Sequence, residues 1–221
     1  MQGRLITLEG PEGAGKTVIA KQLTKALARQ GREVVSTREP GGTALGERLR
    51  AILLSQTTDA AAVDPRADAL LFNAARAQLV TEVIRPALER GAVVICARFT
   101  DSTLAYQGYG AGLPIDDLRA VAALATGGLV PDLTLLLDVP PTLGLARKTG
   151  ASRNRFEAAF DLAFHERVRA GFLALAAAEP ERFRVVDSTR PIGVVAREVI
   201  EAVVAAIERP ATGRPASAPG S

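Results

Sequence analysis

The sequence is poor in the residues that disulfides, cysteine-based metal sites and nucleic-acid surfaces require. It has one cysteine, so no intramolecular disulfide can form and a cysteine-based metal site is not expected. Aromatic residues make up 4% of the 221 residues, so alanine, leucine and valine must fill the core. The net charge of +3 comes from scattered arginines and not from a basic stripe with interleaved aromatics. We therefore expect anionic small molecules, and no nucleic acid, as partners.

Long hydrophobic runs are also absent. No apolar run approaches the length that spans a membrane, and the first residues lack the basic-then-apolar pattern of a signal peptide. The sequence therefore predicts a cytoplasmic protein with no membrane partner. Cys96 lies in the apolar run 92–96 and is predicted to be a buried structural thiol. His165, the only histidine, is predicted to be a structural or dimer-face residue in a long helix.

The sequence does contain a phosphate-binding loop. Residues 10–17 match the pattern G-x-x-x-x-G-K-[ST], and they stand between a strand-like run at 4–9 and a helix-like run at 17–30. Such a loop directs backbone N–H groups and a helix N-terminus at a triphosphate. Lys16 is predicted to reach the β- and γ-phosphates, and the Thr17 hydroxyl to ligate Mg²⁺. The candidate ATP-binding residues of the loop are Gly10, Pro11, Glu12, Gly13, Ala14, Gly15, Lys16 and Thr17.

Short apolar runs alternate with longer helical patterns along the chain. Strands are predicted at 4–9, 33–37, 92–97, 133–137 and 183–186, and helices at 17–30, 45–54, 65–90, 114–126, 141–147, 155–178 and 193–208. This alternation predicts an α/β fold with a doubly wound parallel sheet, whose ligands bind beyond the carboxyl ends of the strands. Residues 1–208 are predicted to form one domain, and residues 209–221 a disordered tail rich in proline, glycine, alanine and serine.

Two segments that follow predicted strands supply candidates for binding phosphates. Residues 37–43 read TREPGGT, a tight loop with two charges at its rim. Residues 97–110 read ARFTDSTLAYQGYG and place an arginine where a strand ends, a position suited to a phosphate clamp. Arg98 is the candidate clamp, Arg38 and Glu39 are the two charges at the rim, and Tyr106 and Gln107 follow closely enough to line the same pocket. The alternative interpretations are a surface turn for residues 37–43, a surface ion pair for Arg98 and a packed ring for Tyr106.

A third segment has the composition of a lid. Residues 147–155 hold three arginines and a lysine around a Gly-Ala-Ser centre. A loop of this kind can close over phosphates, exclude water and bring arginines onto the transferring group. A solvated helix end is the alternative.

Taken together, these motifs resemble those of the bacterial thymidylate kinases. The resemblance rests on LEGPEGAGKT, TREPGGT, LLFNAARAQLV, RFTDSTLAYQGYG, PDLTLLLDVPP and RNRFE…FHERVRAGF, which follow the family's order over roughly residues 4–207. It implies transfer of the γ-phosphoryl group of ATP to dTMP, giving dTDP for dTTP biosynthesis, with Mg²⁺ as the cofactor. It also implies a five-stranded parallel sheet of the P-loop type, a lid at about 147–156 and a homodimer.

The resemblance assigns a dTMP site to this chain. Phe72 would stack on thymine, and Arg76, one turn later on the same helix face, would bond a base carbonyl. Tyr106 would favour deoxyribose by crowding the 2′ position. The full set implied to bind dTMP is Glu12, Arg38, Phe72, Arg76, Arg98, Ser102, Tyr106 and Gln107.

Catalysis and ATP binding are assigned by the same resemblance. Arg147 resembles the residue that lies against adenine, and Arg153 and Arg155 resemble the lid arginines that stabilise the transition state. Together with Lys16 and Arg98, these two lid arginines are the catalytic candidates.

At two positions this chain departs from the family pattern. Ala97 stands where an aspartate usually precedes the arginine, which bears on Mg²⁺ affinity and turnover. Asp101, four positions later, is a candidate to substitute for it through water. Asn154 stands where the lid usually has an aspartate, so the lid arginines lose one negative neighbour.

Three other functions stay open at this point. The chain could be a kinase of another deoxynucleoside monophosphate on the same scaffold. It could be a GTP-dependent switch, although the Asn-Lys-x-Asp run typical of such proteins is missing. It could also be a nucleotide-binding protein whose catalysis is impaired by Ala97.

Overall fold

Five parallel strands form one sheet at the centre of the molecule, whose structure, a computed structural model, describes residues 3–55, 63–148, 155–156 and 160–209. The sheet order is β2-β3-β1-β4-β5, and every neighbouring pair is parallel. The strands are β1 (Arg4–Glu9), β2 (Val34–Arg38), β3 (Val93–Ala97), β4 (Leu133–Asp138) and β5 (Phe183–Asp187). The predicted α/β fold and its five strands are confirmed, each boundary to within one residue.

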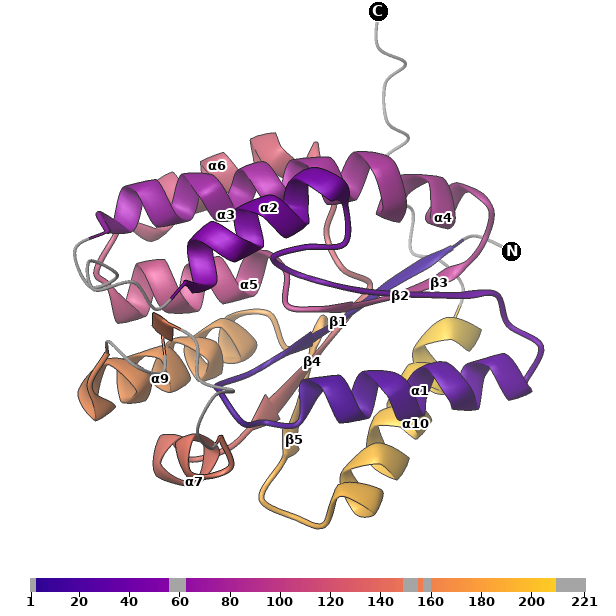
Figure 1. The fold of residues 1–221 in the computed structure, drawn as a ribbon. Helices are drawn as coiled ribbons and strands as arrows, with labels where there is room; N and C mark the ends of the chain where they lie inside the picture. Colours follow the sequence, from indigo (N-terminus) through magenta and orange to yellow (C-terminus); the bar gives the residue numbers. More distant parts are fainter. Residues whose placement is uncertain (1–2, 56–62, 149–154, 157–159, 210–221) are drawn as a thin grey trace, which may run out of the picture.

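Helices cover both faces of the sheet (Figure 1). They are α1 (Lys16–Arg29), α2 (Ala44–Leu54), α3 (Pro65–Leu79), η2 (Val80–Ile84), α4 (Arg85–Glu89), α5 (Thr100–Thr103), η3 (Leu104–Gly110), α6 (Ile115–Thr126), α7 (Pro141–Ala146), α9 (Leu162–Ala178) and α10 (Ile192–Glu208). Alternate strand residues point to opposite faces. Ile6 and Leu8 pack in a cluster with α1 and α10, whereas Leu5 packs in a cluster with α3, η2 and α4. Both faces are therefore apolar, as the continuous hydrophobic strands predict.

The single helix predicted over 65–90 is interrupted. Its middle, η2, is a π-helix in which the N–H of Arg85 donates to the carbonyl of Val80. Pro86 follows at once, and proline has no N–H to continue the α-helical ladder. The break is therefore a consequence of Pro86, which the apolar periodicity does not reveal.

Two further boundaries differ from the prediction. α9 begins at Leu162 and not at 155, because the Asp161 side chain accepts from the N–H of Phe164 at 2.8 Å and caps the helix there. Thr100–Gly110 is helical, as α5 and η3, although no helix was predicted there. Gly108 and Gly110 lower the helical signal of this segment, and packing determines the outcome, since a Cβ on Gly108 would collide with Ile115.

The only cysteine and the only histidine of the sequence are both buried. Cys96 is inaccessible in the cluster with α3 and α4, as predicted. His165 lies buried in α9, which agrees with the structural one of its two predicted roles. No helix in the described part of the chain is long and apolar enough to cross a membrane.

Candidate active site

The phosphate loop joins β1 to α1 in the expected order. Gly10 and Gly13 have φ values of 136° and 69°, and a Cβ on Gly13 would collide with the carbonyl of Gly144, so the loop requires glycine at both positions. No side chain caps α1. The N–H groups of Val18 and Ile19 donate to the carbonyl of Gly15, so only the N–H groups that precede them can meet a ligand at this helix end. The Lys16 ammonium donates to the carbonyls of Gly10 and Pro11, each at 2.8 Å. Desolvation and the nearby Arg98 charge lower the pKa of Lys16 to about 7.

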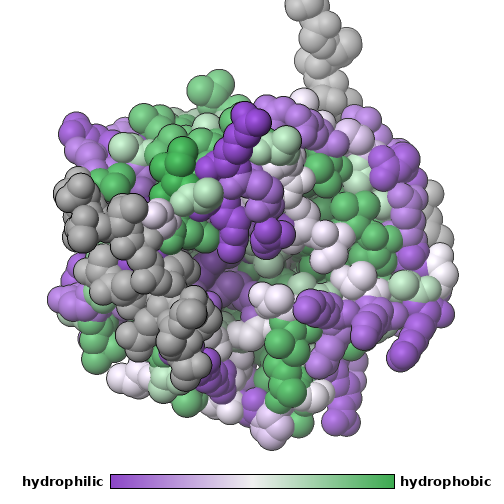
Figure 2. Space-filling model, in the orientation of Figure 1, coloured by the Kyte–Doolittle hydropathy of each residue, from purple (hydrophilic) through white to green (hydrophobic). Residues whose placement is uncertain are grey.

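A pocket of about 310 Å³ opens at the carboxyl ends of β1, β2 and β3. The molecular face in Figure 2 is hollowed near its centre, where hydrophilic side chains border the depression. Residues of the phosphate loop, with Arg147 and Lys148 beside them, form one wall, and residues at the ends of β2 and β3 and on α2 and α3 form the opposite wall. The candidates that line it are Glu12, Gly13, Ala14, Gly15, Lys16, Thr17, Arg38, Phe72, Arg76, Arg98, Ser102, Tyr106, Gln107 and Arg147. Candidates up to 135 residues apart in the sequence, from Glu12 to Arg147, therefore meet in one cavity.

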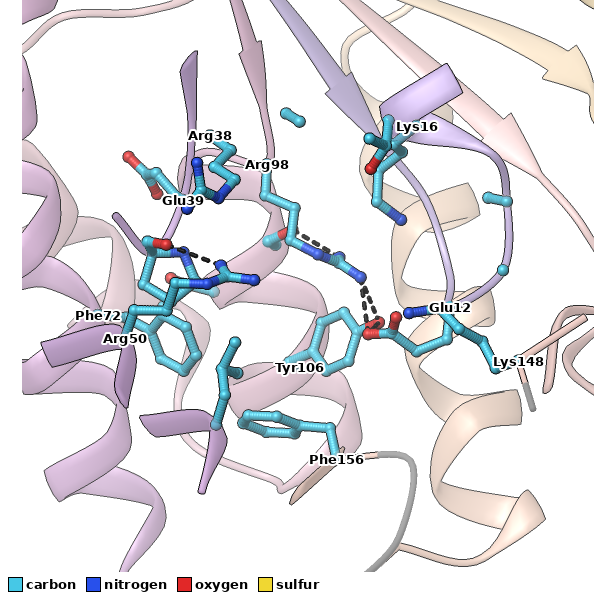
Figure 3. A pocket seen from close by; sticks show the side chains of 18 of the residues that line it. Glu12, Lys16, Arg38, Glu39, Arg50, Phe72, Arg98, Tyr106, Lys148 and Phe156 are labelled. Atoms are coloured by element: carbon cyan, nitrogen blue, oxygen red, sulfur yellow. Dashed lines mark hydrogen bonds and ion pairs between the residues drawn. The ribbon is translucent and has the colours of Figure 1, made fainter. Parts of the chain in front are cut away.

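Arg98 lies at the centre of the pocket (Figure 3). Its φ of 71° is the left-handed conformation, and among the described residues no other non-glycine residue has a positive φ. The guanidinium donates to the carboxylate of Glu12 at 2.8 Å and to the hydroxyl of Tyr106 at 3.1 Å. It also lies 4.9 Å from the centre of the Tyr106 ring, within cation–π range. The sequence interpretation of Tyr106 as a pocket residue beside Arg98 is thus supported by direct contact.

Glu12 and Tyr106 are linked as well. The Tyr106 hydroxyl donates to Glu12 at 3.0 Å, and burial raises the pKa of Tyr106, so this hydroxyl stays protonated and can donate. The Glu12 carboxylate, the Tyr106 hydroxyl and the Arg98 guanidinium are therefore hydrogen-bonded to one another, between the phosphate loop and η3.

Arg76 is another arginine of the pocket and, unlike Arg98, is fully buried. Its guanidinium pairs with Glu39 at 2.8 Å, donates to Asn73 at 2.7 Å, and donates to Thr103 and to the carbonyl of Phe99, each at 3.0 Å. Burial raises the pKa of Glu39, and the Arg76 charge opposes that rise. The prediction that Glu39 stands at the rim of a loop is wrong, because this carboxylate is buried as the partner of Arg76.

Arg50 is a pocket residue that the sequence did not single out. It projects from α2 into the pocket (Figure 3) and donates to the carbonyl of Pro40 at 2.8 Å. Burial and the charge of Arg38 lower the pKa of Arg50, so a third cation stands close to Arg38 and Arg98. Its flanking sequence, LRAILL, resembles any amphipathic helix, and no local signal distinguishes it. Arg38 itself is exposed and pairs with Glu47 at 3.0 Å.

The lid candidates lie only partly within the described residues. Arg147 lines the pocket and donates to the carbonyls of Gly13 and Ser188 at 3.3 and 3.1 Å. Arg153 and Asn154, within 149–154, lie outside the described residues, as does the predicted tail from 210 onward.

Arg155 is not among the residues that line the pocket. Its guanidinium is buried against both carboxylate oxygens of Asp68, at 2.6 Å each, and donates to the carbonyl of Leu53 at 3.1 Å. This differs from the position over phosphates that the resemblance implies, because the Asp68 carboxylate on α3 holds the guanidinium between α2 and α3.

Asp101 does not occupy the place of the missing aspartate. Its carboxylate is buried and bound by Arg182 at 2.8 and 2.9 Å, and it does not line the pocket. The hypothesis that Asp101 substitutes for an acid at position 97 is therefore wrong. Ala97 does line the pocket, directly before Arg98, and brings no ligand to it.

The comparisons with known proteins agree with this geometry. A family model described as thymidylate kinase matches residues 8–199. The thymidylate kinase of Deinococcus radiodurans is 53% identical over 203 residues, which are 91% of this chain and 97% of that protein. The thymidylate kinase of Pseudomonas entomophila is 47% identical over 210 residues, 95% of this chain and 99% of that protein. A crystal structure of thymidylate kinase from Ehrlichia chaffeensis, 32% identical, covers 92% of this chain and 100% of its own, with a TM-score of 0.76.

Proposed function

We propose that this chain, which belongs to the thymidylate kinase family, transfers the γ-phosphoryl group of ATP to dTMP in this pocket, giving dTDP and ADP. The observation that carries the proposal is the meeting of the phosphate loop with Phe72, Arg76 and Arg98 around one cavity. One wall suits a triphosphate and the other a nucleoside monophosphate. The family assignment favours neither a GTP-dependent switch nor an inactive nucleotide-binding protein.

The two phosphate-binding groups have different tasks. Lys16 stands at the start of α1, where its ammonium meets the β- and γ-phosphates of ATP. Arg98 faces it across the loop and receives the dTMP phosphate, exchanging contacts with Glu12 and Tyr106 for charge-assisted bonds to the phosphate. Its position brings acceptor and donor phosphates together, and such positioning supplies most of the catalytic effect in phosphoryl transfer.

The thymine base is assigned to the α3 side of the pocket. Phe72 offers a ring face, and the Nη1 atom of Arg76 has a second hydrogen beside the one donated to Asn73. An arginine that can only donate matches a base carbonyl and not an exocyclic amine. Tyr106 and Gln107, from η3, close the pocket on the sugar and base edge. These contacts favour dTMP over dCMP.

The side chains of the pocket fit a Mg²⁺ ion only if ATP supplies further ligands. Thr17 lines the pocket and offers one hydroxyl, while the described residues hold no cluster of three or more His, Cys, Asp or Glu that could bind a metal. Mg²⁺ usually keeps several waters and takes its remaining ligands from substrate phosphates, so a single hydroxyl fits its needs. When bound, the ion neutralises developing charge on the β- and γ-phosphates.

The proposal also includes the roles of the lid arginines and the division of the chain into one domain, residues 1–208, and a tail, residues 209–221. Arg147 is assigned to the adenine side and Arg153 to the transferring phosphoryl group. A catalytic role for Arg155 requires its ion pair with Asp68 to open, so we assign catalysis to Lys16, Arg98 and Arg153 first.

Dimerisation and location complete the proposal. Leu70 on α3 and Leu124 on α6 are 58% and 85% exposed, although α3 and α6 pack against each other. A neighbouring pair of helices with exposed leucines supports a homodimer through this face. A single species with twice the chain mass in light scattering would agree with it. A cytoplasmic location stays a prediction.

A coupled assay tests the activity directly. The protein is mixed with ATP, Mg²⁺ and dTMP, and ADP and dTDP are followed, with dUMP, dCMP and dGMP as parallel acceptors. Turnover selective for dTMP is expected. A folded sample that binds ATP and turns over no acceptor would overturn the kinase assignment and leave nucleotide binding alone.

A further inference from the structure

Glu9 is a buried carboxylate that the pocket itself does not explain. It is the last residue of β1, directly before the phosphate loop, and it is inaccessible to solvent. It does not line the pocket, so it is not placed to touch a substrate. Burying a carboxylate is costly unless its oxygens are bonded. The partners of Glu9 therefore show what the protein gains from it.

Both partners of Glu9 belong to the segment that carries Arg98. One carboxylate oxygen accepts from the backbone N–H of Phe99 at 2.7 Å, and the other accepts from the hydroxyl of Ser102 at 2.6 Å. The Ser102 oxygen in turn accepts from the Arg98 guanidinium at 3.1 Å. A continuous path thus runs from the carboxylate through a hydroxyl to the phosphate-binding group.

The backbone at Arg98 needs such support. Its left-handed conformation is unfavourable for a residue with a long side chain and persists only where the surroundings fix it. The Arg98 N–H is held by the carbonyl of Leu8 at 2.9 Å, and the next N–H, of Phe99, is held by Glu9. Two successive bonds from the end of β1 therefore fix the turn on both sides of the Arg98 Cα.

We propose that Glu9 is a positioning residue for phosphoryl transfer: its carboxylate holds the Phe99 N–H and the Ser102 hydroxyl, and through them it fixes the Arg98 guanidinium at the phosphate end of the pocket. The proposal rests on the function assigned to Arg98 above. Glu9 also connects the sites of the two substrates. It is covalently bonded to Gly10, the first residue of the phosphate loop, and hydrogen-bonded to the segment that carries Arg98. Ser102 then acts through Arg98 and not as an independent ligand of dTMP.

Four variants test the proposal. Glu9→Gln keeps the size of the side chain and removes its charge. Ser102→Ala removes the relay, and the double variant combines both changes. Thr7→Val is the matched control, since Thr7 lies on the same face of β1, is equally buried, and has a hydroxyl that pairs with Thr134 at 2.8 Å and not with Arg98, Phe99 or Ser102. Circular dichroism and thermal unfolding confirm that each variant is folded.

The expected result is a selective loss at the monophosphate site. Glu9→Gln raises the KM for dTMP at least tenfold and leaves the KM for ATP within twofold, and Ser102→Ala acts in the same direction by a smaller factor. The double variant is no worse than Glu9→Gln alone, because both changes cut one path. Thr7→Val changes thermal stability and neither KM.

Other outcomes overturn the proposal. Equal changes in both KM values, or a dTMP KM within twofold of wild type, would show that Glu9 is only structural. Multiplying effects in the double variant would show that Ser102 contacts dTMP by itself. If Glu9→Gln does not fold, Ser102→Ala decides by the same KM comparison. Calorimetric dTMP binding to wild type and Ser102→Ala supplies the readout if the wild type shows no turnover, so failure of the assigned activity is distinguished from failure of this proposal.

Discussion

Arg76 and Arg98, two of the arginines that line the pocket, are held in opposite ways. The Arg76 side chain is 1% exposed and has a dedicated carboxylate, Glu39, together with Asn73, Thr103 and a backbone carbonyl. The Arg98 side chain is 16% exposed, stands on a strained backbone and shares its closest carboxylate, that of Glu12, with a tyrosine hydroxyl. The Arg76 guanidinium is held by a carboxylate of its own, and the Arg98 guanidinium by shared partners on a strained backbone.

This difference in how the two guanidinium groups are held suits the two tasks proposed for them: Arg76 discriminates between bases, and Arg98 binds a phosphate. A guanidinium that must discriminate between bases gains from a fixed orientation, because a misaligned donor cannot tell a carbonyl from an amine. One that receives a phosphate gains from accessible N–H groups and partners that can be exchanged. We therefore expect changes at Arg98 to reduce phosphate binding and turnover, and changes around Arg76 to reduce stability and selectivity.

The largest expected effect comes from Arg98→Ala. Removing the phosphate clamp should lower kcat/KM for dTMP on the order of a thousandfold, comparable to the loss of a transition-state donor, with little change in the KM for ATP. The coupled assay measures both. Arg182→Lys is a suitable control, because Arg182 pairs with Asp101 and does not line the pocket. A loss below tenfold would remove the distinction between the two arginines.

A second variant addresses the fixed arginine. Arg76→Met leaves the Glu39 carboxylate buried without its cation, which should lower the free energy of unfolding by about 3 kcal/mol. Adding Glu39→Gln removes that charge and should restore much of the stability without restoring dTMP affinity. Urea unfolding and dTMP binding measure the two effects separately. If the double variant is as unstable as Arg76→Met, the unpaired Glu39 charge is not the cause of the lost stability.

The sequence predicted the sheet and the pocket membership of the loop well, because both are local patterns. The glycine-rich phosphate-loop pattern between a strand and a helix specifies its backbone conformation within a few neighbouring residues. It could not predict Glu39 as the partner of Arg76, since the two are 37 residues apart and only the packing of α3 on the β2 end brings them together. Arg50 and Glu9 were missed for the same reason. The burial of Arg155 against Asp68 likewise depends on a contact 87 residues apart.

A smaller effect follows from the burial of Lys16 beside the charge of Arg98. The pKa of Lys16 is lowered to about 7 from its ordinary 10.5, so above pH 7 the free protein carries mostly neutral Lys16. Triphosphate binding favours the charged form, so binding above pH 7 takes up a proton and weakens as pH rises, by at most tenfold per unit. Calorimetry in buffers with different ionisation enthalpies measures this uptake at pH 8. In Lys16→Arg, which does not titrate, the uptake should disappear; uptake that persists there would point to another group.

The smallest expected effect comes from Ala97→Asp, which would give Arg98 a neighbouring carboxylate of the kind that Glu39 provides to Arg76. Ala97 lines the pocket directly before Arg98, where an acid can also hold water bound to Mg²⁺. We expect the Mg²⁺ concentration for half-maximal activity to fall severalfold, with the KM for dTMP within about twofold of wild type, because Glu9 already fixes the turn. Ala97→Asn is the matched control, since it adds the same volume without charge. An unchanged Mg²⁺ dependence in Ala97→Asp would show that the phosphates of ATP and Thr17 suffice, and that the missing aspartate has no cost in this chain.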